Sequence, residues 1–279
     1  MSKPLLSPTT GWPPALTIAG SDSGGGAGIQ ADLKTFAALG VFGTAAITAV
    51  TAQNTYEVRD VQVLTPDMVV SQIMAVYDDI HPRAAKTGML ANTGIVKAVC
   101  ATIEKLADMP VVVDPVAFTS TGTRLLTDDA FEALRDELVP LAVLITPNLR
   151  EAAALSGIEI ETSDDMLRAA DVLLGRGAKA VLLKGGHRIG DADDLYLDGE
   201  RQEWLRAEQI ESTCTHGTGC SLSAATAAGL ALGMPLFEAI QNAKVFITEA
   251  IRHGYVIGQG HSPVNHFYMH EHARERSVR

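Results

Sequence analysis

The chain has 279 residues, of which 47% are hydrophobic and 5% aromatic, and such a chain can bury a large core in one large α/β domain or two small ones. Its formal net charge of −11 argues against a broad nucleic-acid surface. An anionic ligand therefore needs a local site, built from backbone N–H groups, a helix N-terminus and one or two lysines.

The first 14 residues contain one lysine, several prolines and no apolar core, so they are neither a signal peptide nor a membrane span. We interpret residues 1–14 as a flexible leader and residues 15–279 as a single domain. The three cysteines, Cys100, Cys214 and Cys220, form neither an even disulfide framework nor a paired metal-ligand spacing. This pattern indicates a reducing compartment, and we expect a cytoplasmic protein without membrane or nucleic-acid partners.

Short β-branched runs alternate with longer amphipathic stretches along the chain, which predicts an α/β fold with a mostly parallel sheet and helices on both faces. Strands are expected at residues 15–19, 43–50, 84–87, 111–114, 143–146 and 180–184. Helices are expected at residues 30–39, 66–80, 93–107, 128–138, 150–155, 164–176 and 236–253, and a hairpin at 195–197 and 202–205. The apolar stretch 222–237 is short and rich in Ala and Gly, which favours a buried helix over a membrane segment.

The segment 215–221, Thr-His-Gly-Thr-Gly-Cys-Ser, joins a glycine-rich loop to a strongly helical sequence. Gly217 and Gly219 allow a tight backbone whose N–H groups converge on one oxyanion, and the helix adds the positive end of its dipole. The same field is expected to lower the pKa of Cys220, which could then accept a proton from a hydroxyl group. A glycine turn that caps a buried helix beside an inert cysteine is an equally open interpretation.

Polar residues follow several of the expected strands, at the sheet edge where open α/β folds bind ligands. Gly20, Asp114, Asn148 and Lys184 all lie at or just past such strand ends. A lysine at the end of an apolar strand is costly unless it reaches a phosphate or a carboxylate. Asn148 and Glu151 also have the spacing of a helix cap, so they could serve only their helix.

The sequence leaves two other interpretations open. Residues 26–31, Gly-Ala-Gly-Ile-Gln-Ala, satisfy a relaxed dinucleotide fingerprint and would suggest a NAD-dependent dehydrogenase. No acidic residue ends a second strand at the expected distance, and the dehydrogenase interpretation leaves residues 217–220 without a role. A catalytically inactive binding protein on the same fold would bind ligands without turnover.

Eight segments, in this order, resemble the hydroxymethylpyrimidine/phosphomethylpyrimidine kinases of thiamine synthesis, within the ribokinase-like small-molecule kinases. They are residues 16–34, 52–54, 86–90, 113–115, 146–152, 184–187, 215–221 and 263–267. The resemblance covers roughly residues 15–268, and the cysteine at 220 stands where sugar kinases carry aspartate. One departure is Cys214, where the family usually has asparagine.

The resemblance implies a three-layer α/β/α ribokinase-like fold, ATP and Mg²⁺ as cofactors, and a homodimer. It implies phosphorylation of 4-amino-5-hydroxymethyl-2-methylpyrimidine and then of its monophosphate. The catalytic anion hole would comprise Gly217, Thr218, Gly219 and Cys220, and ATP would contact Asn148, Lys184 and Thr218. Glu151 would hold Mg²⁺ through water, with Asp114 sharing that role. The acceptor pocket would comprise Gly20, Asp32, Thr51, Gln53 and Met89.

The acceptor pocket has residue types that suit an aminopyrimidine. Gln53 offers one amide donor and one acceptor, which can pair with a ring nitrogen and the adjacent amine, and Met89 offers an adaptable apolar surface. Gln53 could instead be a satisfied turn residue, and Asp32 could be a surface residue of its helix. Pyridoxine, another flat ring with a hydroxymethyl group, is the competing substrate. His187 and His216 receive no catalytic role.

Overall fold

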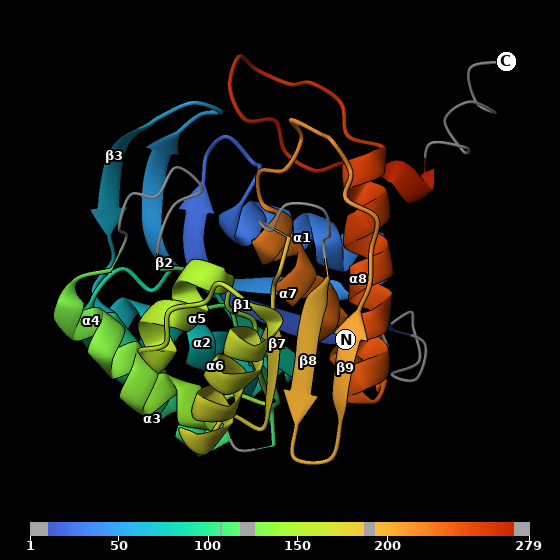
Figure 1. Cartoon of the computed structure of the whole chain (residues 1–279). Helices are drawn as coiled ribbons and strands as arrows, with labels where there is room; N and C mark the ends of the chain where they lie inside the picture. The colour runs from blue at the N-terminus through green and yellow to red at the C-terminus, as the bar shows by residue number, and fades with distance from the viewer. Residues whose placement is uncertain (1–10, 107, 118–125, 187–192, 271–279) are drawn as a thin grey trace, which may run out of the picture.

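The computed structural model describes residues 11–106, 108–117, 126–186 and 193–270 (Figure 1). Its strands form one sheet in the order β3-β2-β1-β4-β5-β6-β7-β8-β9. β1, β2 and β4 to β7 run parallel, whereas β3, β8 and β9 are each antiparallel to the strand before them. The strands are β1 (Pro14–Asp22), β2 (Phe42–Gln53), β3 (Val58–Val63), β4 (Ala84–Thr87), β5 (Val111–Val113), β6 (Leu144–Ile145), β7 (Ala180–Leu183), β8 (Asp194–Asp198) and β9 (Gln202–Leu205).

Helices cover both faces of this sheet, and Figure 1 shows α3 to α6 gathered apart from α1, α7 and α8. Val111 and Val113 of β5 point into the core beneath α2 to α6, and Val112 points into the core beneath α1, α7 and α8. The predicted three-layer α/β/α fold is therefore confirmed. The helices are α1 (Gly28–Ala38), α2 (Pro66–Ile80), α3 (Thr93–Ile103), α4 (Asp128–Ala133), α5 (Leu149–Ser156), α6 (Ser163–Gly175), α7 (Thr218–Ala231) and α8 (Leu236–Arg252).

The predicted elements agree with the structure in kind outside residues 222–237, and the bounds of α2 and β4 agree to the residue. The hairpin of β8 and β9 is also confirmed. β3 was missed. Five of its six residues are exposed, because it is an edge strand with solvent on both faces, so it carries no alternation of apolar and polar residues.

The expectation of one buried helix over 222–237 is wrong. α7 ends at Ala231 and α8 begins at Leu236, with a turn between them. Gly233 has φ of 86°, the left-handed conformation that commonly ends a helix, and Pro235 cannot continue the α7 hydrogen-bond ladder. Gly233 and Pro235 are a helix-stop signal that is visible in the sequence, and the expectation gave more weight to the apolar composition of the stretch.

The expected leader lies mostly outside the described residues, as do residues 271–279 of the expected domain. Pro14 opens β1, and the carbonyl oxygen of Pro13 accepts the N–H of Phe42 at 2.9 Å. The last two residues of the supposed leader are therefore part of the fold, and the flexible-leader interpretation is wrong for them. Within the described ranges, no helix is long and apolar enough to cross a membrane.

Candidate active site

The parallel strands all end at one edge of the sheet, and the N-terminus of α7 lies at the same edge. A methyl group at Gly219 would lie 3.1 Å from Nζ of Lys184 and 3.8 Å from Oδ2 of Asp114. Three segments far apart in sequence thus meet at one point, as expected for ligand sites in open α/β sheets. The residues at this edge are Gly20, Gln53, Met89, Asp114, Asn148 and Lys184.

The loop before α7 has the tight backbone that the sequence predicted. Gly217 is the N-cap residue with φ of 79°, and a methyl group there would overlap the carbonyl oxygen of Gly26. Thr218 directs both its N–H and its hydroxyl group to the carbonyl oxygen of Thr215, at 3.2 and 2.6 Å. In the described part of the chain, the N–H groups of Gly219 and Cys220 have no acceptor. They are left to bind an anion at the positive end of the helix dipole.

The expectation that the helix lowers the pKa of Cys220 is wrong. Burial raises the pKa of the thiol to about 11, and the carboxylates of Asp32 and Asp114 raise it further. Lys86 and the N–H of Gly28 lower this pKa, but by less than burial and the carboxylates raise it. Cys220 is therefore a thiol at neutral pH. The burial of the thiol and the carboxylates near it, which together raise its pKa, could not be read from the sequence.

Lys184 and Asp114 form an ion pair beside α7. Nζ of Lys184 lies 3.1 Å from Oδ1 of Asp114, and the two side chains are 14% and 3% exposed. Asp114 also accepts hydrogen bonds from the hydroxyl groups of Thr146 at 3.2 Å and Ser223 at 3.4 Å. Burial lowers the pKa of Lys184, but Asp114 and Glu151 outweigh it and raise that pKa. The ammonium group is thus a permanent positive charge beside residues 215–220, which we call the anion loop.

Asn148 and Glu151 form a reciprocal capping box at the start of α5. The side chain of Asn148 accepts the N–H of Glu151 at 2.9 Å, and Oε2 of Glu151 accepts the N–H of Asn148 at 2.9 Å. The N–H of Ala117 approaches Oε1 at 3.4 Å. Burial raises the pKa of Glu151 to about 7, and Asp114 adds to this rise while Lys184 opposes it. The capping interpretation is therefore confirmed, and it does not exclude a second role.

The donor set at this edge fits Mg²⁺ better than a transition metal. No group of three or more His, Cys, Asp or Glu side chains that could hold a metal exists among the described residues. Asp114 and Glu151 supply two buried carboxylates, and Mg²⁺ usually takes one or two carboxylates together with water and substrate phosphates. These two residues could hold Mg²⁺ beside a bound nucleotide.

The interpretation of Asp32 as a surface residue of its helix is wrong. Its side chain and that of Lys86 are both 0% exposed, with Nζ of Lys86 at 3.1 Å from Oδ2 of Asp32. Oδ2 also accepts the hydroxyl group of Thr17 at 2.6 Å. The carboxylate is thus held between α1, β1 and β4, and its predicted contact with the acceptor stays a prediction.

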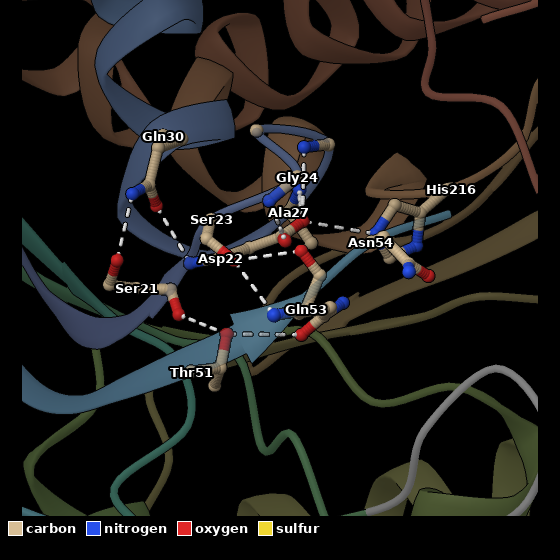
Figure 2. A network of polar contacts seen from close by, with 12 residues as sticks. Ser21, Asp22, Ser23, Gly24, Ala27, Gln30, Thr51, Gln53, Asn54 and His216 are labelled. Carbon is tan, nitrogen blue, oxygen red and sulfur yellow. Dashed lines mark hydrogen bonds and ion pairs between the residues drawn. The ribbon is translucent and has the colours of Figure 1, made fainter. Parts of the chain in front are cut away.

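The other predicted pocket residues come together at the ends of β1, β2 and β4. A methyl group at Gly20 would overlap Cε of Met89, so these two residues are in contact. Thr51 donates its hydroxyl group to the carbonyl oxygen of Ser21 at 2.8 Å and lies 3.4 Å from Oε1 of Gln53 (Figure 2). The backbone of Gln53 is fixed by the hydroxyl group of Ser23, whose oxygen lies 2.7 Å from both its N and its O.

Sequence reasoning missed three residues at this edge: Asp22, Lys86 and, as a functional residue, His216. Oδ2 of Asp22 lies 3.2 Å from Nε2 of His216, and this pair joins the glycine-rich loop of residues 23–28 to the loop before α7. Lys86 could have been found by the reasoning applied to Lys184, since it too sits in an apolar strand. His187 lies outside the described residues.

The chain matches known proteins over most of its length. A family model described as phosphomethylpyrimidine kinase matches residues 22–265. A hydroxymethylpyrimidine/phosphomethylpyrimidine kinase of Synechococcus elongatus is 49% identical over 92% of this chain and 98% of its own. The thiamine biosynthesis bifunctional protein ThiED of Geobacter sulfurreducens is 46% identical over 94% of this chain, which spans 54% of that protein.

A solved structure leads to the same group of enzymes. The ADP complex of Bacillus subtilis pyridoxal kinase superposes with a TM-score of 0.86 at 41% identity, over 93% of this chain and 99% of that chain. The family model and the relatives carry the family, and the solved structure shows the same fold. The chain therefore belongs to the phosphomethylpyrimidine kinase family.

Proposed function

We propose that this protein is an ATP-dependent kinase that phosphorylates 4-amino-5-hydroxymethyl-2-methylpyrimidine and its monophosphate in thiamine biosynthesis. The observation that carries the proposal is the meeting of the α7 N-terminus with Lys184 and Asp114, at 3.1 and 3.8 Å from the position of a methyl group on Gly219. The names of the relatives from Synechococcus and Geobacter support this substrate and pathway. The cytoplasmic location and the homodimer stay predictions.

Phosphoryl transfer needs positioning and charge neutralisation more than covalent chemistry. The free N–H groups of Gly219 and Cys220 would bind the oxygens of the transferring phosphoryl group, and Lys184 would neutralise their charge. Asn148, at the start of α5 beside Lys184, would contact the nucleotide. ADP in the Bacillus subtilis pyridoxal kinase structure supports a nucleotide on this fold.

Mg²⁺, when bound, would shield the negative charge of the phosphates. Asp114 and Glu151 would hold it, and the raised pKa of Glu151, about 7, is the response of a buried carboxyl group without enough positive charge nearby. Lys184 already pairs with Oδ1 of Asp114, so it keeps that carboxylate oriented toward the anion loop.

The acceptor would lie across from the nucleotide, against the ends of β1, β2 and β4, which we call the acceptor wall. Met89 is partly exposed in contact with Gly20 and would support the flat ring. Gln53, whose backbone is fixed by Ser23, would present its amide to the ring nitrogen and the neighbouring amine. These contacts would direct the hydroxymethyl group toward Cys220 and the anion loop.

Pyridoxal kinase activity is the second candidate, because the Bacillus subtilis pyridoxal kinase superposes over 93% of this chain. The dehydrogenase interpretation has no such support, since β2 ends at Gln53 and not at an acidic residue. One assay separates the candidates: ADP release from ATP with hydroxymethylpyrimidine, its monophosphate, pyridoxine or a sugar as acceptor. We expect the highest kcat/KM with the two pyrimidines and no turnover in excess EDTA. A preference for pyridoxine or a sugar would contradict the proposal.

Cys220→Ala tests the proton acceptor. We expect kcat to fall on the order of a hundredfold with the Kd for ATP nearly unchanged, because the variant keeps every backbone N–H group. With the thiol pKa raised to about 11, the thiolate fraction of the parent grows as pH rises, so its kcat should rise with pH more steeply than that of the variant. Near-parent turnover would show that the thiol only packs and that the backbone N–H groups and Lys184 carry the chemistry.

Gln53→Leu tests substrate choice. The parent should prefer the aminopyrimidine over pyridoxine, because an amide built to pair with the amine is left unsatisfied when the amine is absent, at a cost of about 1 to 3 kcal/mol. In Gln53→Leu, kcat/KM for the pyrimidine should fall more than that for pyridoxine. Gln62→Leu, at an exposed glutamine of β3, is the matched control. An equal loss for both substrates would mean that Gln53 does not recognise the amine.

A further inference from the structure

Two glycine-rich loops that are far apart in the sequence meet at Asp22, the last residue of β1. Oδ1 of Asp22 accepts the N–H of Gly24 at 2.8 Å, and Oδ2 accepts the N–H groups of Gly26 at 3.0 Å and Ala27 at 2.8 Å. Oδ2 also lies 3.2 Å from Nε2 of His216, 194 residues away (Figure 2). One carboxylate therefore shapes the loop after β1 and reaches the loop before α7.

The hydrogen bond between Asp22 and His216 has a fixed direction. A carboxylate of lowered pKa accepts and does not donate, so Nε2 of His216 carries the proton. Burial raises the pKa of Asp22, but its bonds to His216, Ala27 and Gly24 outweigh this and lower it. The side chains of His216 and Asp22 are 19% and 5% exposed, so water competes little for this charge-assisted bond.

His216 is also fixed through its backbone. Its N–H donates to the carbonyl oxygen of Ser262 at 3.1 Å, and its own carbonyl oxygen accepts the N–H of Val264 at 3.3 Å. The imidazole ring covers Gly26 so closely that a methyl group there would overlap Cδ2 of His216. The next residue, Gly217, packs in turn on the carbonyl oxygen of Gly26. The two loops therefore contact each other over two consecutive residues.

We propose that Asp22 and His216 are positioning residues that hold the anion loop, residues 215–220, in register with the loop of residues 23–28. The inference rests on the proposed kinase function. His216 directly precedes the N-cap of α7, and Asp22 lies two residues after Gly20 of the acceptor wall. A bond between them sets the separation of the phosphoryl group and the acceptor hydroxyl group. Neither residue needs to touch a substrate to do this.

The test compares His216→Leu with His216→Gln. Leucine keeps apolar volume over Gly26 but cannot donate, whereas glutamine keeps an N–H donor for Asp22. We expect kcat of His216→Leu to fall on the order of ten- to a hundredfold, because a small misplacement of reacting groups costs that much. The Kd values for ATP and for the acceptor, each measured alone by calorimetry, should change little. His216→Gln should recover part of kcat.

His253→Leu is the matched control, since His253 is 44% exposed at the end of α8, where its ring bonds to Glu249 and stacks on Tyr268, far from Asp22 in the sequence. Its kcat should equal that of the parent. Asp22→Asn is a second variant for the case in which His216→Leu folds poorly. In a double-mutant cycle, the losses of kcat in the two single variants should not add in the double variant. Parent-like kcat in His216→Leu, equal kcat in the Leu and Gln variants, or additive losses would overturn the proposal. An inactive parent would instead contradict the kinase function itself.

Discussion

Gly217→Ala is expected to remove most of the turnover, with kcat lower by about a hundredfold or more. The residue has φ of 79°, where a side chain costs about 1 to 2 kcal/mol in backbone conformation alone. The added methyl group would also overlap the carbonyl oxygen of Gly26, so the anion loop must move away from its neighbour. The N–H groups of Gly219 and Cys220 would move with it. Steady-state kinetics and urea unfolding measure the two effects separately.

Gly233→Ala provides a matched control for the conformational part of this effect. Gly233 has φ of 86°, but a methyl group there would meet no atom within 4 Å. We expect this variant to lose about 1 to 2 kcal/mol of stability with kcat unchanged. If Gly217→Ala loses no more activity than Gly233→Ala, the contact between the two glycine loops has no role in catalysis.

The sequence predicted the sheet and the edge where the site lies because both depend on local patterns. Short runs of four to eight residues predicted the parallel strands, and a lysine or asparagine at or just past the end of such a run marks a strand end. Lys184 and Asn148 were found in this way, and the structure places them side by side. The glycine pattern of residues 217–219 likewise predicted a tight helix start, and Gly217 has the positive φ that this requires.

Long-range electrostatics could not be predicted in the same way. Asp32 pairs with a lysine 54 residues away and Asp22 with a histidine 194 residues away, and no local pattern indicates either partner. The pKa of Cys220 depends on burial and on carboxylates from α1 and the end of β5, so the local expectation from its helix had the wrong sign. β3 was missed because an exposed edge strand needs no apolar face.

Lys86→Met is expected to cause the largest loss of stability, about 3 to 5 kcal/mol, because it leaves a buried carboxylate unpaired. Lys86 and Asp32 are both fully buried at 3.1 Å, and without the ammonium group only the hydroxyl group of Thr17 would bond to Asp32. Burial already raises the pKa of Asp32, and Lys86 opposes that rise. In the variant the pKa must rise further. A group whose pKa is raised on folding makes the protein less stable as pH increases. The loss of stability caused by Lys86→Met should therefore become smaller when acid protonates Asp32.

Two further variants distinguish an unpaired buried charge from simple loss of packing. Lys97→Met removes an ion pair of 3.6 Å with Glu137, in which the side chains are 59% and 44% exposed, and should cost about 1 kcal/mol or less. The double variant Lys86→Met with Asp32→Leu removes both buried charges, and it should recover most of the stability lost by Lys86→Met, because the desolvated carboxylate is gone. Urea unfolding at neutral and acid pH measures all three proteins. If the double variant is no more stable than Lys86→Met, the lysine stabilises the fold through the packing of its aliphatic chain and not through its charge.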